Sequence, residues 1–114
     1  MDYELFMSFS RIIGLIPAKT VLRAVELERW MIQDHLTSPQ AEHRHDAVSI
    51  LSFWYFLRSV RFGEEMHPAS PPPEHLPFYR ETVERLVEAR ELPANATEQF
   101  DYAFADDFLN VIAA

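Results

Sequence analysis

Apolar side chains recur every three or four residues along most of the chain, which is the period of an amphipathic helix. The pattern predicts helices over about 3–13, 17–36, 39–62, 77–92 and 97–112. Asp2 is placed to cap the first helix, which we expect Gly14 to end, and Pro17 suits the first position of the second. No stretch shows the alternation of a strand and no internal repeat is visible. The sequence therefore predicts an all-α fold.

The third of these helices differs from the others because its centre is apolar around nearly all of its circumference. A capping box over 37–40 and Gly63 mark its ends. The apolar run covers residues 47–57, whereas a membrane span needs about 20 apolar residues. We therefore expect the helix at about 39–62 to be the buried hub of a compact bundle of about five helices, with no membrane span.

A connector follows the hub, because residues 63–77 hold five of the eight prolines. Helix does not persist through such a segment. The part that follows is too short to fold alone, so we expect residues 1–114 to form a single helical domain.

Composition excludes several kinds of site. The chain has no cysteine, which removes disulfides and thiolate metal centres, and its two glycines are too few for a phosphate-binding loop. No serine lies in a Gly-x-Ser-x-Gly turn, so no hydrolase is predicted. Acidic residues stand where a secretory signal would carry basic ones, and we expect a cytoplasmic protein without an export signal.

The net charge of −8 is uneven along the sequence. Residues 1–62 hold seven acids and seven bases, whereas residues 63–114 hold eleven acids and three arginines. A C-terminal half of this charge repels nucleic acid and attracts a basic protein surface, such as that of a nucleic-acid-binding protein.

A cluster of polar residues at the start of the third helix is the candidate metal site. Glu42, His45 and Asp46 are three and four residues apart and share one face, and His35 lies just across the preceding turn. Imidazole and carboxylate ligands suit zinc, iron or manganese. A small helical metal-binding protein is therefore one alternative, and no other cofactor is predicted.

The leading hypothesis is a non-enzymatic protein interaction module, such as an adaptor, regulator or inhibitor. Its expected contact residues are two apolar anchors and the acids of the last two helices: Trp30, Met31, Glu81, Glu84, Glu88, Glu91, Asp101, Asp106 and Asp107. The two anchors would serve a homodimer equally well. A further alternative is a small-molecule pocket lined by the aromatic residues 53–56, although core packing is the simpler role for them.

Overall fold

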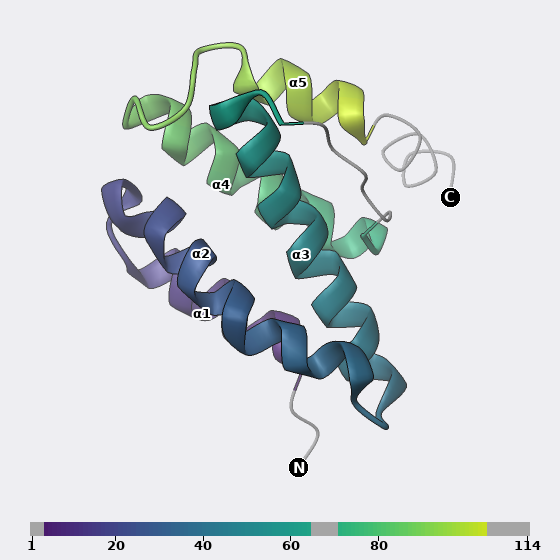
Figure 1. The fold of residues 1–114 in the computed structure, drawn as a ribbon. Coiled ribbons are helices and arrows are strands. Elements are labelled where there is room, and N and C mark those ends of the chain that lie inside the picture. Colours follow the sequence, from purple (N-terminus) through teal and green to yellow (C-terminus); the bar gives the residue numbers. More distant parts are fainter. Residues whose placement is uncertain (1–3, 65–70, 105–114) are drawn as a thin grey trace.

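The computed structural model describes residues 4–64 and 71–104, and these contain helices and no strand (Figure 1). The α-helices are α1 (Leu5–Leu15), α2 (Ala18–Gln33), α3 (Ala41–Phe62), α4 (Leu76–Glu88) and α5 (Ala96–Ala103). Two 3₁₀ turns, η1 (Asp34–Thr37) and η2 (Pro73–His75), precede α3 and α4. The predicted all-α fold is confirmed. Within the described ranges no helix has the length and apolar character to cross a bilayer.

Helix α3 is the hub of the fold, as predicted. It runs through the middle of the molecule, where it packs against α1, α2 and α5 and crosses α4 (Figure 1). Phe53 stacks on Tyr79 of α4 with ring centroids 4.4 Å apart, and Phe56 meets Phe100 of α5 edge to face at 5.3 Å. Burial of each such side chain stabilises the fold by about 1.5–3 kcal/mol. These contacts join α3 to α4 and α5 within a single hydrophobic core.

One stripe of α3 nevertheless faces outward. Val48, Tyr55 and Phe62 are spaced by seven residues and are 36%, 45% and 60% exposed. The expectation that the hub is buried around nearly its whole circumference is therefore wrong along this stripe. Two of its members adjoin residues near α2: the Tyr55 ring lies 4.8 Å from that of Trp54, and Phe62 lines a groove together with Leu22 of α2.

Helix α1 is held at both ends by charged side chains from other helices. At its N-terminus, Oδ2 of Asp46 accepts a hydrogen bond from the backbone N–H of Phe6 at 2.9 Å. At its C-terminus, the Arg85 guanidinium donates to the carbonyls of Ile13 and Ile16 at 3.1 and 2.7 Å. Both charges match the helix dipole. Arg85 therefore docks α4 on α1.

The end of α1 and the start of α3 differ from the predicted ones for local reasons. Helix α1 continues through Gly14 and stops where Ile16 becomes extended, because a residue before proline avoids the helical conformation. The 37–40 capping box does not form: the Ser38 hydroxyl accepts from Gln40 N–H, while Thr37 belongs to η1. Gly63 does close α3 in the left-handed conformation, with φ 69°.

Helix α4 starts one residue before the predicted 77 and ends at Glu88, four residues before the predicted 92. Arg90 takes a left-handed φ of 61°, and the N–H groups of Arg90 and Glu91 donate to Val87 and Leu86. These two hydrogen bonds form a Schellman motif, which ends a helix by satisfying its last carbonyls. Helix α5 begins near its predicted start, and the part expected over 105–112 lies outside the described residues.

Candidate functional site

Arginine and aromatic side chains alternate along the surface where α2 packs beside α3. The guanidinium carbon of Arg29 lies 3.9 Å from the ring centroid of Trp30 and 4.4 Å from that of Trp54. Arg58 continues the series, 5.1 Å from Trp54 and 5.0 Å from Phe62. Cation–π contacts of this kind contribute about 0.5–1 kcal/mol at exposed sites. We call these five residues, with their exposed apolar neighbours on α2 and Tyr55 on α3, the arginine-aromatic face.

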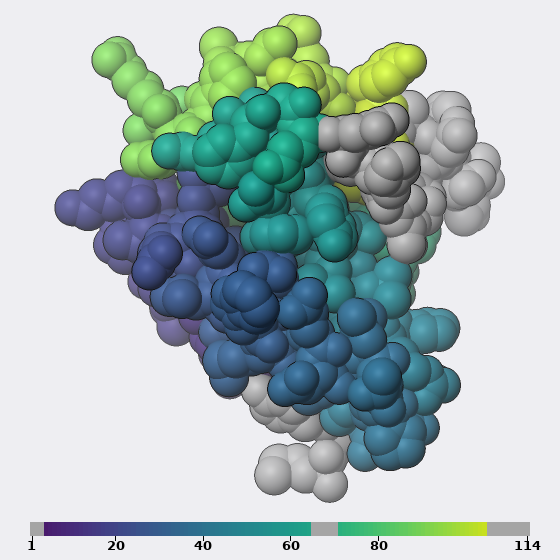
Figure 2. All heavy atoms as spheres, viewed as in Figure 1, coloured from purple at the N-terminus to yellow at the C-terminus, as the bar shows by residue number. Residues whose placement is uncertain are grey.

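Large apolar side chains of this face are open to solvent. Leu27, Trp30 and Met31 lie on one side of α2 and are 53%, 61% and 65% exposed. The surfaces of α2 and α3 adjoin on one side of the molecule in Figure 2. The expectation that Trp30 and Met31 lie at the surface is therefore confirmed, and Tyr55 and Phe62 of α3 extend the apolar area.

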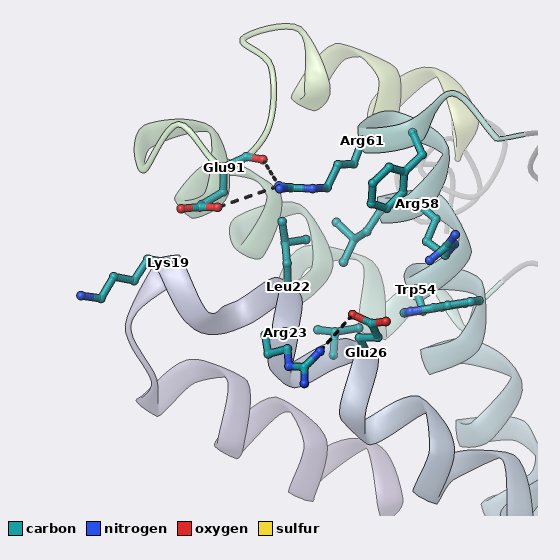
Figure 3. Close-up of a pocket in the computed structure, with 11 residues that line it drawn as sticks. Lys19, Leu22, Arg23, Glu26, Trp54, Arg58, Arg61 and Glu91 are labelled. Carbon is teal, nitrogen blue, oxygen red and sulfur yellow. Dashed lines mark hydrogen bonds and ion pairs between the residues drawn. The ribbon is translucent and has the colours of Figure 1, made fainter.

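A groove of about 320 Å³ lies beside this face, between α2, the end of α3 and the segment after α4 (Figure 3). Leu22, Trp54 and Leu57 line its apolar part. Its charged lining residues are Lys19, Arg23, Glu26, Arg58, Arg61 and Glu91. Figure 3 shows Arg61 directed across the groove to Glu91, while Lys19 extends outward. The groove thus combines an apolar lining with more cations than anions.

The cations of the face and groove differ in how fully they are neutralised. Arg58 binds Glu64 through two hydrogen bonds of 2.9 and 2.5 Å, and these lower the pKa of the Glu64 carboxyl. Arg61 donates to the backbone carbonyl of Glu91 at 3.0 Å. By contrast, within residues 4–64 and 71–104 no carboxylate pairs with Arg29, and its buried Nε has no hydrogen-bond partner. Arg29 is therefore a cation restrained by two rings, with no carboxylate partner among the described residues.

The candidate metal ligands only partly come together. Glu42, His45 and Asp46 line a pocket of about 520 Å³ at the N-terminal ends of α1 and α3. His35 is elsewhere, its ring edge-on to His43 at 5.5 Å, and Asp46 is engaged in capping α1. Among the residues whose structure is described, no three His, Asp or Glu side chains are grouped so that they could hold a metal ion. The metal site stays a prediction without structural support.

The acidic surface of α4 and α5 is partly neutralised by its own arginine. Glu81, Glu84 and Glu88 are exposed on α4. Arg80 pairs with Glu84 and also binds both carboxylate oxygens of Asp101, at 2.8 and 3.0 Å. Glu91 lies by Arg61 in the groove, with its carboxylate 3.9 Å away, and positions 106 and 107 lie outside the described residues. This surface is consequently less anionic than the sequence count indicates.

A buried polar network of Ser49, His75 and Tyr79 was not predicted from the sequence. The hydroxyl oxygen of Ser49 lies 2.9 Å from Nδ1 of His75 and 2.7 Å from the Tyr79 hydroxyl. His75 also stacks on Phe6 at 3.6 Å, and its burial lowers its pKa, against the opposing effect of Asp46 and other carboxylates. A serine beside a histidine resembles a nucleophile and its base, but Ser49 is fully buried and out of reach of a substrate. The network therefore serves the core.

The aromatic run 53–56 divides between the core and the surface. Phe53 and Phe56 are buried, Trp54 lines the groove, and Tyr55 is exposed. The run therefore does not converge on one small-molecule pocket. No known family model, curated protein or solved structure matches this chain. The function is therefore inferred from the chemistry of the protein's own surfaces.

Proposed function

We propose that this protein is a non-enzymatic interaction module that binds a protein partner through the arginine-aromatic face. The observation that carries the proposal is the position of Arg29, held between Trp30 and Trp54 on an exposed surface. Trp, Tyr, Arg and Met are the residues enriched in protein interfaces, and Trp, Tyr and Arg dominate their binding energy. The face contains all four types.

The rigidity of the face also favours binding. An exposed arginine usually loses side-chain entropy when it is fixed in a complex. Arg29 is already restrained by two indole rings, so less of this entropy remains to be lost. Exposed apolar side chains on two adjacent helices add area whose burial is favourable.

A second candidate is the acidic surface of α4 and α5, with a basic protein as its partner. Glu81 and Glu88 favour it, since both are exposed and form no ion pair with any residue that the structure describes. We give it second place because Arg80 offsets part of the negative charge of the neighbouring Glu84 and Asp101. For either surface, the absence of cysteine agrees with a cytoplasmic site of action.

Site-specific photo-cross-linking in cells of the source organism tests the proposed face. Benzoylphenylalanine replaces Tyr55 on the face, and in a matched variant it replaces Tyr102 on α5, which is 88% exposed. We expect a discrete adduct from position 55 that disappears when Trp30→Ala is added. Mass spectrometry then identifies the adduct, and the purified partner should lose affinity for Trp30→Ala by at least about tenfold.

Three outcomes would count against the proposal. Equal adducts from positions 55 and 102 would show that position 55 merely samples nearby proteins. An adduct whose yield is unchanged by Trp30→Ala would show that the partner does not contact Trp30. Absence of any adduct from position 55, with circular dichroism confirming the fold, would mean that the face has no partner in those cells.

A further inference from the structure

We infer that the partner binds the arginine-aromatic face with an acidic segment, in which Asp or Glu residues flank an apolar side chain. This inference rests on the proposed function and adds the chemistry of the partner. Three features carry it: the charge of Arg29, which no carboxylate of the described residues pairs, the cations around the groove, and the apolar lining between them.

Arg29 needs an anion that the described part of this chain does not supply. Its guanidinium is stacked against Trp30 and Trp54, so its buried Nε is closed off by packing. The other nitrogens of a guanidinium can bind a carboxylate in a planar, two-bond arrangement. A carboxylate from a partner would meet a cation whose orientation is already fixed.

The groove beside the arginine-aromatic face also favours a ligand with carboxylates. Arg23 lies 3.9 Å from Glu26 with its side chain 73% exposed, so this contact leaves it largely available to an incoming anion. Lys19 forms no ion pair with any described residue. Between these cations, Leu22 and Leu57 offer an apolar lining in about 320 Å³. An apolar side chain seated there places its flanking residues beside the cations.

Charge also favours an acidic segment over two other occupants of this face, a second copy of the protein and nucleic acid. In a two-fold contact the same patch lies on both copies, so a surface with more cations than anions would meet a second such surface, which is unfavourable. Nucleic acid would find stacking surfaces in the two tryptophans, but a chain of net charge −8 repels a polyanion. A short acidic and apolar segment satisfies the local cations without either conflict.

Selection from a phage-displayed library of random 12-residue peptides tests the inference. The library is panned on the wild-type protein, on Arg29→Gln, on the exposed double variant Lys19→Glu/Arg23→Glu, and on Arg11→Glu as a charge control on α1. We expect wild type and Arg11→Glu to enrich peptides with Asp or Glu beside Leu, Phe or Trp. The selected peptides should bind Arg29→Gln and the double variant at least about tenfold more weakly, and wild type more weakly as salt rises.

Enrichment of basic or neutral peptides, or none, would overturn the inference, as would equal binding to Arg29→Gln. A dimer of the protein in sedimentation that Arg29→Gln dissociates would assign the face to a second copy, and tighter binding to oligo(dT) than to the peptides would assign it to nucleic acid. Failure here is distinguishable from failure of the proposed function. A partner cross-linked from position 55 through a basic or uncharged segment would keep the docking face and refute only the acidic chemistry.

Discussion

At the scale of single residues, the buried network of Ser49, His75 and Tyr79 shows how a polar group is accommodated in this core. The Ser49 hydroxyl contacts both partners, so the polar atoms that meet there are satisfied inside the fold. Such networks are stabilising when complete and costly when one member is missing. His75 is the member whose ordinary pKa lies near neutral pH; the residue is 8% exposed and its ring stacks on Phe6.

Acidification should destabilise the protein through His75. Burial lowers the pKa of His75 in the fold, while Asp46, Glu74 and Glu4 act in the opposite direction without reversing the shift. As the pH falls below the ordinary histidine value of about 6.5, the unfolded state takes up the proton first, so the free energy of unfolding decreases. The decrease stops once the pH is below the pKa of the folded state.

Urea unfolding between pH 5 and 7.5 measures this dependence. In His75→Asn an amide stands near the position of Nδ1 but does not titrate, so the variant should lose part of the wild-type slope across that interval. A variant with the full wild-type slope would show that other groups cause the pH dependence. Ser10→Ala, which removes a hydroxyl bound to the exposed Met7 carbonyl, serves as a control for substitution itself.

Arg90 occupies a position where glycine would be better. Its φ of 61° is left-handed, which costs a residue with a Cβ about 1–2 kcal/mol, whereas glycine adopts it freely but loses more entropy on folding. We expect Arg90→Gly to raise the free energy of unfolding by about 0.5–1 kcal/mol, measured by urea titration. A lower free energy of unfolding than that of the wild type would mean that the Arg90 side chain contributes more than its backbone costs.

At the scale of elements, α1 is stabilised from outside its own sequence. Its N-cap residue, Glu4, makes no side-chain capping hydrogen bond, and the last turn of α1 contains no basic residue. Asp46 and Arg85 provide the missing charges from α3 and α4. The two side chains therefore join three helices as well as capping one.

Removing either outside cap should destabilise the whole fold. Asp46→Ala and Arg85→Gln should each lower the free energy of unfolding by about 1–2 kcal/mol, because the freed backbone groups of α1 lose a charged partner. Chemical denaturation followed by circular dichroism gives the values. Arg11→Gln, on the exposed side of α1, should stay within about 0.5 kcal/mol of wild type. Losses as small as that for the two capping variants would contradict the assigned role.

The helices themselves were predictable because their signals are local, but their docking was not. Three- and four-residue periodicity placed all five helices, and Gly63 correctly marked the end of α3. The caps of α1 join residues 40 and 72 positions apart, a separation at which no periodicity or capping pattern acts. The candidate site shows the same division. The sequence suggested Trp30 as an apolar anchor for a partner, whereas the contacts that Arg29 makes with both Trp30 and Trp54 depend on the pairing of α2 with α3.

At the scale of the whole molecule, the fold presents two surfaces of different chemistry. The paired helices α2 and α3 present arginines and aromatic residues, and α4 carries exposed carboxylates. The sequence indicated the second surface through its net charge, but the first depends on contacts between helices. Because both tryptophans of the chain belong to the arginine-aromatic face, each is a natural probe of that face.

Proton–nitrogen correlation spectra, recorded while a cross-linked partner or a selected peptide is added, test the central claim most directly. The proposed docking face predicts that the indole N–H signals of Trp30 and Trp54 shift together with the Nε signal of Arg29, while the backbone amides of α4 stay in place. Shifts confined to the amides of Glu81, Glu84 and Glu88, with both indole signals unmoved, would contradict it and assign binding to the acidic surface.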